Sequence, residues 1–146
     1  MKFKNFIKIF FAILFVFVST HSYAKTIKWS MQGDSLTLDP HAQNEGPTTQ
    51  VSRQVYEALV TRGLDMSIEP QLATDWKTTD PNTWVFNLRK GVKFSDGTDM
   101  TAKDVVFSIL RAKQPTSDFK EYISTISDVK EIDNYTCLLY TSDAAD

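Results

Sequence analysis

Residues 83–110 predict a strand, a turn and a helix in succession, and they read TWVFNLRKGVKFSDGTDMTAKDVVFSIL. Apolar and polar side chains alternate over the first six positions, so Trp84, Phe86 and Leu88 share one face of the strand. The turn is predicted at Ser-Asp-Gly-Thr, residues 95–98, because Asp accepts hydrogen bonds from the backbone that follows it and Gly tolerates a positive φ.

The helix is predicted to begin after Thr101, which forms a capping-box pattern with Asp104 three residues later. Its apolar residues recur at helical spacing and define the stripe that should be buried: Ala102, Val105, Val106, Ile109 and Leu110. Pro115 ends the helix, because proline cannot donate the next backbone hydrogen bond. We expect this helix to cover the apolar face of the preceding strand.

The chain before this segment also predicts both kinds of element. Residues 26–31 alternate with period two and predict a first strand. A helix is predicted from Thr48, where Pro47 suits the start and Gly63 the end, because apolar side chains recur at every fourth position: Val51, Val55 and Leu59. Residues 64–68 suit a short strand or a hairpin arm.

Turn-prone residues and alternating segments continue on both sides. Asp80-Pro81-Asn82 predicts a turn. Residues 118–127 have a helix-like spacing of apolar side chains but remain ambiguous. Residues 129–132 and 135–139 are expected to pair as strands across the turn-prone Asp133-Asn134. These expectations describe an α/β chain of mixed α and β structure.

Composition excludes several classes of protein. The 146 residues contain 16 Lys and Arg against 18 Asp and Glu, which gives a net charge of −2 and no general basic surface for nucleic acid. Five Gly and five Pro exclude a collagen or a low-complexity polymer. The single Cys137 excludes an internal disulfide.

The first 24 residues have the pattern of a cleaved signal peptide. Three Lys precede ten consecutive apolar residues, Ile9–Val18, and the first 24 residues contain no acidic residue. Ten residues are too few to span a bilayer as a helix. Ser22 and Ala24 occupy the −3 and −1 positions of a cleavage site before Lys25. We therefore expect residues 1–24 to be a signal peptide. The alternative is an uncleaved anchor for a membrane-attached interaction protein.

Catalytic and metal-binding patterns are sparse in residues 25–146. His41 is their one histidine, and it follows Pro40 in an expected loop. The sequence contains no G-x-S-x-G, Cys-x-x-Cys, H-E-x-x-H, phosphate-cradling glycine loop or D-x-D-x-D-G calcium pattern. We therefore predict no metal, no cofactor and no enzymatic activity. An exported hydrolase that uses His41 is the alternative of a different class.

Three stretches resemble extracytoplasmic solute-binding proteins of family 5, which serve peptide ABC importers. The first comprises LTLDPH at 36–41 together with VSRQVYEALV at 51–60. The second is EPQLATDW at 69–76. The third and most specific is WVFNLRKGVKFSDG at 84–97, which continues as TAKDVVFS at 101–108. They occur in family order within residues 26–136.

This resemblance implies a fold and a function. It implies a two-lobed periplasmic-binding-protein fold, type II-like and of the peptide-binding class, with residues 25–136 forming the N-terminal part of lobe I. It also implies a monomeric periplasmic protein that captures oligopeptides or dipeptides by lobe closure and delivers them to a membrane permease. The same scaffold binding nickel chelate, haem, glutathione or another small solute is the alternative.

The resemblance also implies a candidate binding loop. It places peptide-backbone contacts after Asp39-Pro40-His41, at Asn44, Glu45 and Gly46, where Glu-Gly is offset by about one residue from the family pattern. The stretch 84–108 is expected to be structural, because its residues explain a strand, a turn and a helix.

The last ten residues, 137–146, read CLLYTSDAAD and resemble translated adapter read-through in metagenomic reading frames. We therefore expect them to be a non-native tail, with native sequence ending near Thr136. A chain cut at that point is expected to be marginally stable, with apolar side chains such as Trp84, Phe86 and Leu88 left uncovered.

Overall fold

The computed structural model describes residues 25–142, so the predicted signal peptide and its cleavage site lie outside the described residues. The chain divides into two units at residue 30, and residues 31–142 belong to the second unit. The predicted strand at 26–31 is wrong, since these residues belong to neither sheet, and Ile27 and Trp29 are exposed. Alternation alone does not make a strand, because its backbone groups need a hydrogen-bonding neighbour.

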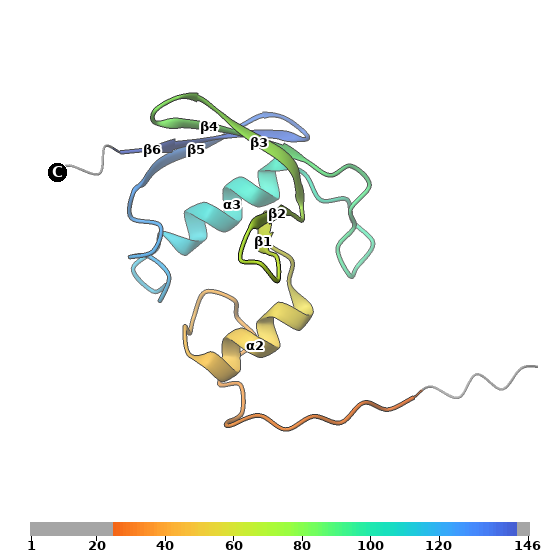
Figure 1. Cartoon of the computed structure of the whole chain (residues 1–146). Coiled ribbons are helices and arrows are strands. Elements are labelled where there is room, and N and C mark those ends of the chain that lie inside the picture. The colour runs from red at the N-terminus through yellow and green to blue at the C-terminus, as the bar shows by residue number, and fades with distance from the viewer. Residues whose placement is uncertain (1–24, 143–146) are drawn as a thin grey trace, which may run out of the picture. The chain divides into compact units, whose positions relative to one another are not determined.

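The second unit contains a four-stranded antiparallel sheet (Figure 1). Its strands are β3 (Ala73–Asp80), β4 (Thr83–Leu88), β5 (Ile126–Asp133) and β6 (Thr136–Thr141), in the order β3-β4-β6-β5. β4 has the predicted bounds, and the turn before it forms where the Asn82 amide donates to the Asp80 carboxylate at 3.0 Å. The predicted pairing of two strands across Asp133-Asn134 is confirmed.

One face of this sheet carries the apolar residues of β4. Phe86 is opposite Trp76 on one side and Cys137 on the other, while Trp84 is opposite Leu139. Antiparallel partners project to the same face, so these side chains form one apolar layer. Leu88, at the end of β4, is buried.

Helix α3 (Ala102–Ala112) packs against the apolar side of the sheet (Figure 1). Thr101 and Asp104 form the predicted capping box, in which the Asp104 carboxylate accepts from the Thr101 amide at 2.7 Å. The buried core includes two residues of the predicted stripe and residues from three other segments: Leu88, Met100, Ala102, Val105 and Cys137. Leu110, predicted to be buried, is 44% exposed because it lies at the edge of the stripe.

The turn between β4 and α3 has the predicted geometry. The Asp96 carboxylate accepts from the Thr98 amide at 2.9 Å, and Gly97 has a φ of +89°. A side chain at residue 97 would therefore be strained, even though its position is open to solvent.

Helix α2 (Gly46–Val55) confirms the predicted helix but ends earlier than its apolar spacing indicated. Leu59 lies outside it, because the Leu59 carbonyl accepts from the amides of Gln71 and Ala73 at 3.2 and 2.9 Å. A carbonyl bound to another segment cannot continue the helical ladder.

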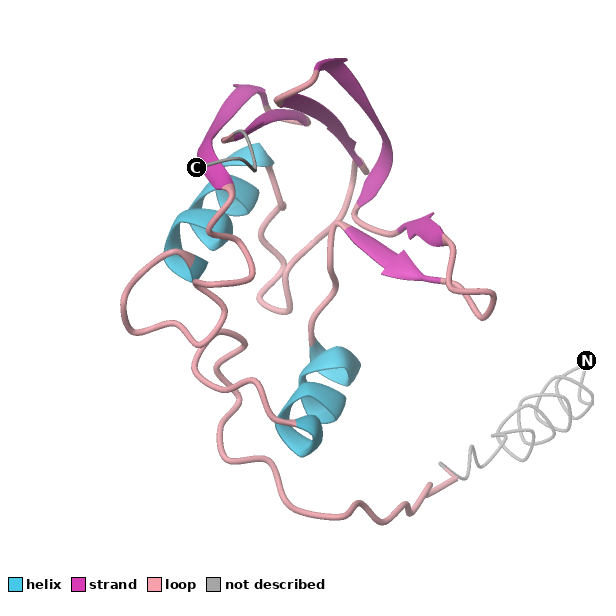
Figure 2. Ribbon diagram, turned by 60° about the vertical axis from the view of Figure 1, so that its left-hand side comes forward, coloured by secondary structure: helices cyan, strands magenta, loops and turns pink. Residues whose placement is uncertain are grey.

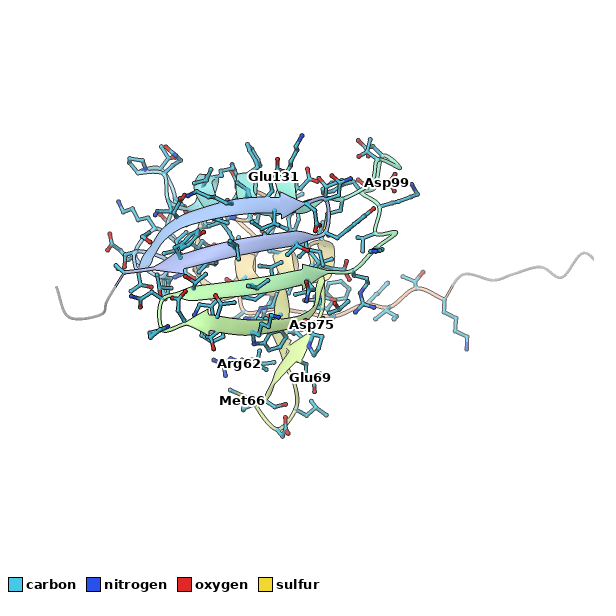
Figure 3. The ribbon with its side chains drawn as sticks, turned by 90° about the horizontal axis from the view of Figure 1, so that it is seen from above. Arg62, Met66, Glu69, Asp75, Asp99 and Glu131 are labelled. Carbon is cyan, nitrogen blue, oxygen red and sulfur yellow. The ribbon has the colours of Figure 1, made fainter. Side chains whose placement is uncertain are left out.

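A hairpin of two short strands follows, β1 (Val60–Arg62) and β2 (Ile68–Pro70), and it forms a separate sheet (Figure 2). Viewed from above, the hairpin residues Arg62, Met66 and Glu69 lie beyond the β3 edge, and Glu131 lies at the opposite edge on β5 (Figure 3). The predicted hairpin arm at 64–68 is therefore mostly the turn, in which Met66 has a φ of +67°.

Residues 118–127 do not form the helix that their spacing allowed. The chain makes successive turns there, with amide-to-carbonyl bonds three residues apart, such as Tyr122 to Phe119 at 3.0 Å. β5 then begins at Ile126, which removes the length that a helix would need. No helix among residues 25–142 is long and apolar enough to cross a membrane.

The expected non-native tail begins inside β6, whereas residues 143–146 lie outside the described residues. β6 pairs with both β4 and β5, and Cys137 is 1% exposed. This pairing says nothing about the origin of residues 137–141, because main-chain hydrogen bonds form with any side chains.

Candidate ligand-binding site

The candidate loop begins with a tight turn around Asp39. The Asp39 carboxylate accepts from the His41 amide at 3.0 Å, and the Asp39 amide donates to the Thr37 hydroxyl at 3.0 Å. The Ala42 amide donates to the Asp39 carbonyl at 3.4 Å. Since Pro40 fixes its own φ, local chemistry is sufficient to reverse the chain here.

The three predicted site residues lie together between this turn and α2, with their side chains directed differently. The side-chain amide of Asn44 donates to the Tyr122 hydroxyl at 2.9 Å. The Glu45 carboxylate accepts from the Thr48 hydroxyl, and the Glu45 carbonyl accepts from the Thr49 amide at 3.0 Å. Gly46 is the first residue of α2, and no atom lies within 4 Å of the place a Cβ would take.

The backbone amides at Asn44, Glu45 and Gly46 donate to no acceptor in the described part of the chain. The first amides of any helix lack intrahelical partners, and the partial positive charge at a helix N-terminus favours an acceptor there. Pro47 has no backbone N–H, so it adds no donor to these three amides.

Arg111, in the last turn of α3, binds the turn around Asp39 through its side chain. Its guanidinium donates to both oxygens of the Asp39 carboxylate, at 2.9 and 2.5 Å, and lies 3.1 Å from Nδ1 of His41. These hydrogen bonds lower the pKa of Asp39 from 3.8 to about 2 and raise the pKa of Arg111.

The hydrogen-bond partner of His41 differs from the one that the hydrolase alternative requires. The pKa of His41 is lowered, mainly by partial burial and to a smaller extent by the positive charge of Arg111. The lower pKa favours the neutral ring. Nδ1 then accepts from Arg111, although a catalytic histidine of the triad type has a carboxylate at that nitrogen. Asp39, the adjacent carboxylate, is bound to the guanidinium instead. In residues 25–142 no three His, Cys, Asp or Glu residues are grouped so as to hold a metal ion.

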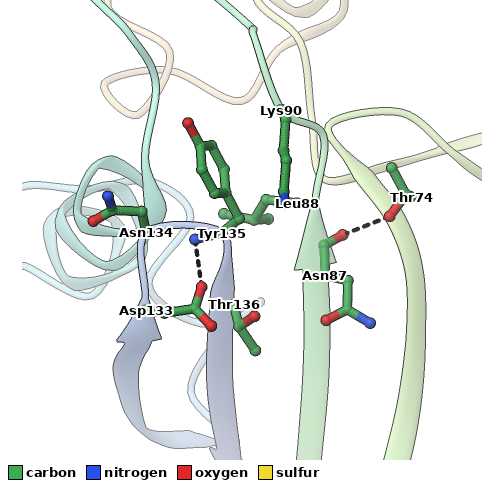
Figure 4. A pocket seen from close by; sticks show the side chains of 8 residues that line it. All are labelled: Thr74, Asn87, Leu88, Lys90, Asp133, Asn134, Tyr135 and Thr136. Carbon is green, nitrogen blue, oxygen red and sulfur yellow. Dashed lines mark hydrogen bonds between the residues drawn. The ribbon is translucent and has the colours of Figure 1, made fainter.

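A second feature is an open depression of about 710 Å³ at one end of the four-stranded sheet (Figure 4). None of the predicted site residues lines it. Its lining comes from β3, the end of β4 and the β5–β6 turn: Thr74, Asn87, Leu88, Lys90, Asp133, Asn134, Tyr135 and Thr136.

Local contacts already occupy several polar groups in this depression. The Asp133 carboxylate accepts from the Tyr135 amide at 2.7 Å, which is the bond of a turn. The Lys90 ammonium lies 5.5 Å from the centroid of the Tyr135 ring. Sequence reasoning missed this depression because Lys90 and Tyr135 meet only through the pairing of β4 with β6.

Apolar side chains line a smaller hollow of about 260 Å³ between the β1–β2 hairpin and the sheet: Val60, Ile68, Trp76, Trp84, Phe86 and Leu139. The prediction of uncovered apolar residues is therefore wrong for Leu88, which is 4% exposed in the core. Trp84 and Phe86 are half-buried and remain accessible from the hollow.

Comparison with known proteins extends the sequence resemblance. The family model for bacterial extracellular solute-binding proteins, family 5 Middle, matches residues 67–145. The periplasmic oligopeptide-binding protein OppA of Escherichia coli K12 is 40% identical over 81 residues, which are 56% of this chain and 15% of OppA. The glutathione-binding protein GsiB of Escherichia coli O6:K15:H31 is 31% identical over 100 residues, which are 68% of this chain and 20% of GsiB.

Solved structures agree with the sequence matches. The murein tripeptide binding protein MppA of Escherichia coli superposes with a TM-score of 0.72 at 30% identity, over 77% of this chain and 26% of MppA. The chain thus spans a fifth or less of the two curated relatives above. These structural neighbours are two-lobed, and the chain corresponds to part of their first lobe. The mixed α and β chain therefore belongs to the bacterial extracellular solute-binding proteins of family 5.

Proposed function

We propose that the protein to which this chain contributes is the substrate-binding component of a peptide ABC importer. It captures oligopeptides or dipeptides in the periplasm by lobe closure and delivers them to a membrane permease, as a monomer without enzymatic activity. The observation that carries this proposal is the 40% identity with a periplasmic oligopeptide-binding protein. MppA, whose name also records a peptide ligand, supports it through its fold.

The loop at Asn44, Glu45 and Gly46 is the proposed peptide contact within this chain. An extended peptide presents a carbonyl at each residue, and the loop presents amides that have no acceptor among residues 25–142. The open space at Gly46 lets a second backbone approach closely. Because the contact is made by the main chain, it selects for peptide rather than for particular side chains.

The second candidate is the same scaffold with glutathione or another small solute as its ligand. GsiB favours it, because the name of that relative records glutathione and its match covers 68% of this chain, against 56% for OppA. Glutathione also has amide carbonyls, so the loop alone does not separate the two ligands.

The first experiment is a long read of genomic DNA beyond codon 136. An open frame of several hundred codons supports the proposal, and its product can be purified and titrated with trialanine and with glutathione. A stop codon directly after Asp146 would contradict both the transport proposal and the expected non-native origin of residues 137–146. Purified product that binds neither probe would also contradict the transport proposal.

Gly46 allows a sharp test of the proposed contact. Gly46→Pro removes one amide donor, and the extended conformation of Glu45, with φ −93° and ψ 159°, is compatible with a following proline. We expect trialanine to bind about threefold to tenfold more weakly, which is the effect of one neutral hydrogen bond. Gly46→Ala keeps the donor and serves as the matched control. Equal affinities for the two variants would contradict the proposed contact.

A further inference from the structure

Arg111 and Asp39 join two segments that lie 72 residues apart. The guanidinium donates to both carboxylate oxygens, which fixes the orientation of the carboxylate as well as its distance. The same guanidinium reaches Nδ1 of His41 at 3.1 Å, two residues further along the loop. One arginine therefore contacts the turn at two points.

The backbone that carries Arg111 is held in place at several points. Arg111 lies in the last turn of α3, whose first turn is fixed by the capping box, and its neighbour Ala112 is buried. After the helix, the Lys113 ammonium donates to the carbonyl of Ser127 at 3.1 Å, which ties this end of α3 to β5. The Asp39 turn, in contrast, belongs to no strand or helix.

Other supports of the loop include single contacts with the turns at 117–122, and the Tyr56 hydroxyl donates to the Leu38 carbonyl at 2.8 Å. The Asp118 amide donates to the His41 carbonyl at 3.0 Å, and the Asn44 side chain donates to the Tyr122 hydroxyl at 2.9 Å. The Phe119 ring meets the His41 ring edge-on, with 6.5 Å between centroids. The double hydrogen bond from Arg111 is the one contact here that is both charged and bidentate.

We propose that Arg111 is a positioning residue, which through Asp39 holds the open amides at Asn44, Glu45 and Gly46 in one orientation and so sets the affinity for peptide. This inference rests on the proposed function. Arg111 is not itself a ligand for a peptide carboxylate, because Asp39 already occupies both of its terminal nitrogens. Its effect is indirect, and loop order and affinity should therefore change together.

Four variants test this inference. Arg111→Ala removes the guanidinium, and Asp39→Asn removes the charge of its partner while keeping its shape. Arg111→Lys keeps the positive charge but cannot donate to both oxygens in the same geometry. Lys103→Ala is the matched control, since Lys103 is an exposed cation on the same helix and forms no ion pair with residues 25–142.

The first measurement is the NMR order parameter of the loop amides in the 146-residue chain. In Arg111→Ala and Asp39→Asn we expect the order parameters at residues 44–46 to fall from about 0.85 towards 0.6, with Arg111→Lys between them and Lys103→Ala unchanged. Amide exchange in β4 and β6 should not change. Unchanged loop order, or equal loss of protection throughout the sheet, would overturn the inference.

The second measurement is the dissociation constant for trialanine in the longer gene product. Arg111→Ala and Asp39→Asn should each weaken binding by about threefold to tenfold, with Arg111→Lys intermediate. A disordered loop with unchanged affinity would overturn the positioning role. If the unmodified product binds no peptide, the proposed function fails together with the affinity half of the inference, and the order parameters still decide whether Arg111 holds the loop.

Discussion

Trp76 of β3 stacks on Phe86 of β4, with ring centroids 6.4 Å apart and ring planes inclined by 24°. The two residues are direct partners in the antiparallel register. β3 is an edge strand with one neighbour in the four-stranded sheet, so this ring pair is a principal side-chain contact that holds the edge in place.

Phe86→Ala should therefore loosen β3 selectively. We expect amide hydrogen exchange in β3 to become about tenfold faster, because an aromatic cross-strand pair and its buried area are lost. Exchange in β5, on the far side of β6, should change much less. Val85→Ala alters the same strand on its opposite face and is the control. Similar acceleration of β3 exchange in both variants would contradict the role given to the ring pair.

The capping box makes α3 sensitive at Thr101. Thr101→Ala should destabilise the helix by about 1 kcal/mol, because its first turn loses a polar cap. Circular dichroism during urea titration measures this loss. Ser108→Ala, at an exposed position of the same helix, should be neutral or slightly stabilising, since Ala has the higher helix propensity. A Thr101→Ala chain as helical as the unmodified one at every urea concentration would contradict the prediction.

The contact between Asp39 and Arg111 predicts a dependence on acid. The pKa of Asp39 is about 2 in the folded chain and 3.8 ordinarily, mainly because Arg111 donates to the carboxylate. Its stabilising effect is present above pH 4 and is lost as the pH falls from about 4 to 2. Carbon-13 NMR titration of the Asp39 carboxyl should show this low pKa, and Arg111→Ala should return it towards 3.8. An Asp39 pKa near 3.8 in the unmodified chain would contradict the contact.

Cys137 should be an inert thiol in the folded chain. It is 1% exposed, and burial raises its pKa to about 11. The thiolate is the reactive form, so an aromatic disulfide reagent at pH 8 should react slowly with the native chain and rapidly in urea. Leu139→Ala, which thins the same apolar layer, should speed the native reaction. Equally fast labelling with and without urea would show that β6 does not shield residue 137.

The parts of the fold that sequence analysis predicted are those specified locally. β4 alternates cleanly, and the Thr101–Asp104 box marks the start of α3 within four residues. β3 was not predicted, because Asp75, Lys77 and the residues that follow are polar on both faces. It becomes a strand through pairing with β4, which is a tertiary effect.

In the candidate site too, sequence analysis predicted one part and missed another. The resemblance predicts Asn44, Glu45 and Gly46 as the binding loop, and the structure shows them as neighbours whose backbone amides have no partner within the described part of the chain. The support from Arg111 was not predictable, because a pair 72 residues apart has no signature in local spacing. The depression at the sheet end depends likewise on strand order, which brings the β5–β6 turn beside Lys90.

The position of β6 has a consequence for biosynthesis. β6 follows β4 and β5 in the sequence but lies between them in the sheet, and β5 has no other neighbour in the described sheet. A nascent chain can close the β3–β4 hairpin early, but β5 must wait for β6 before it joins that hairpin. Until residue 141 has left the exit tunnel, the apolar side of α3 lacks Cys137 beneath it. The four-stranded sheet should therefore close only after β6 emerges, and a chaperone that shields apolar helices would act before that step.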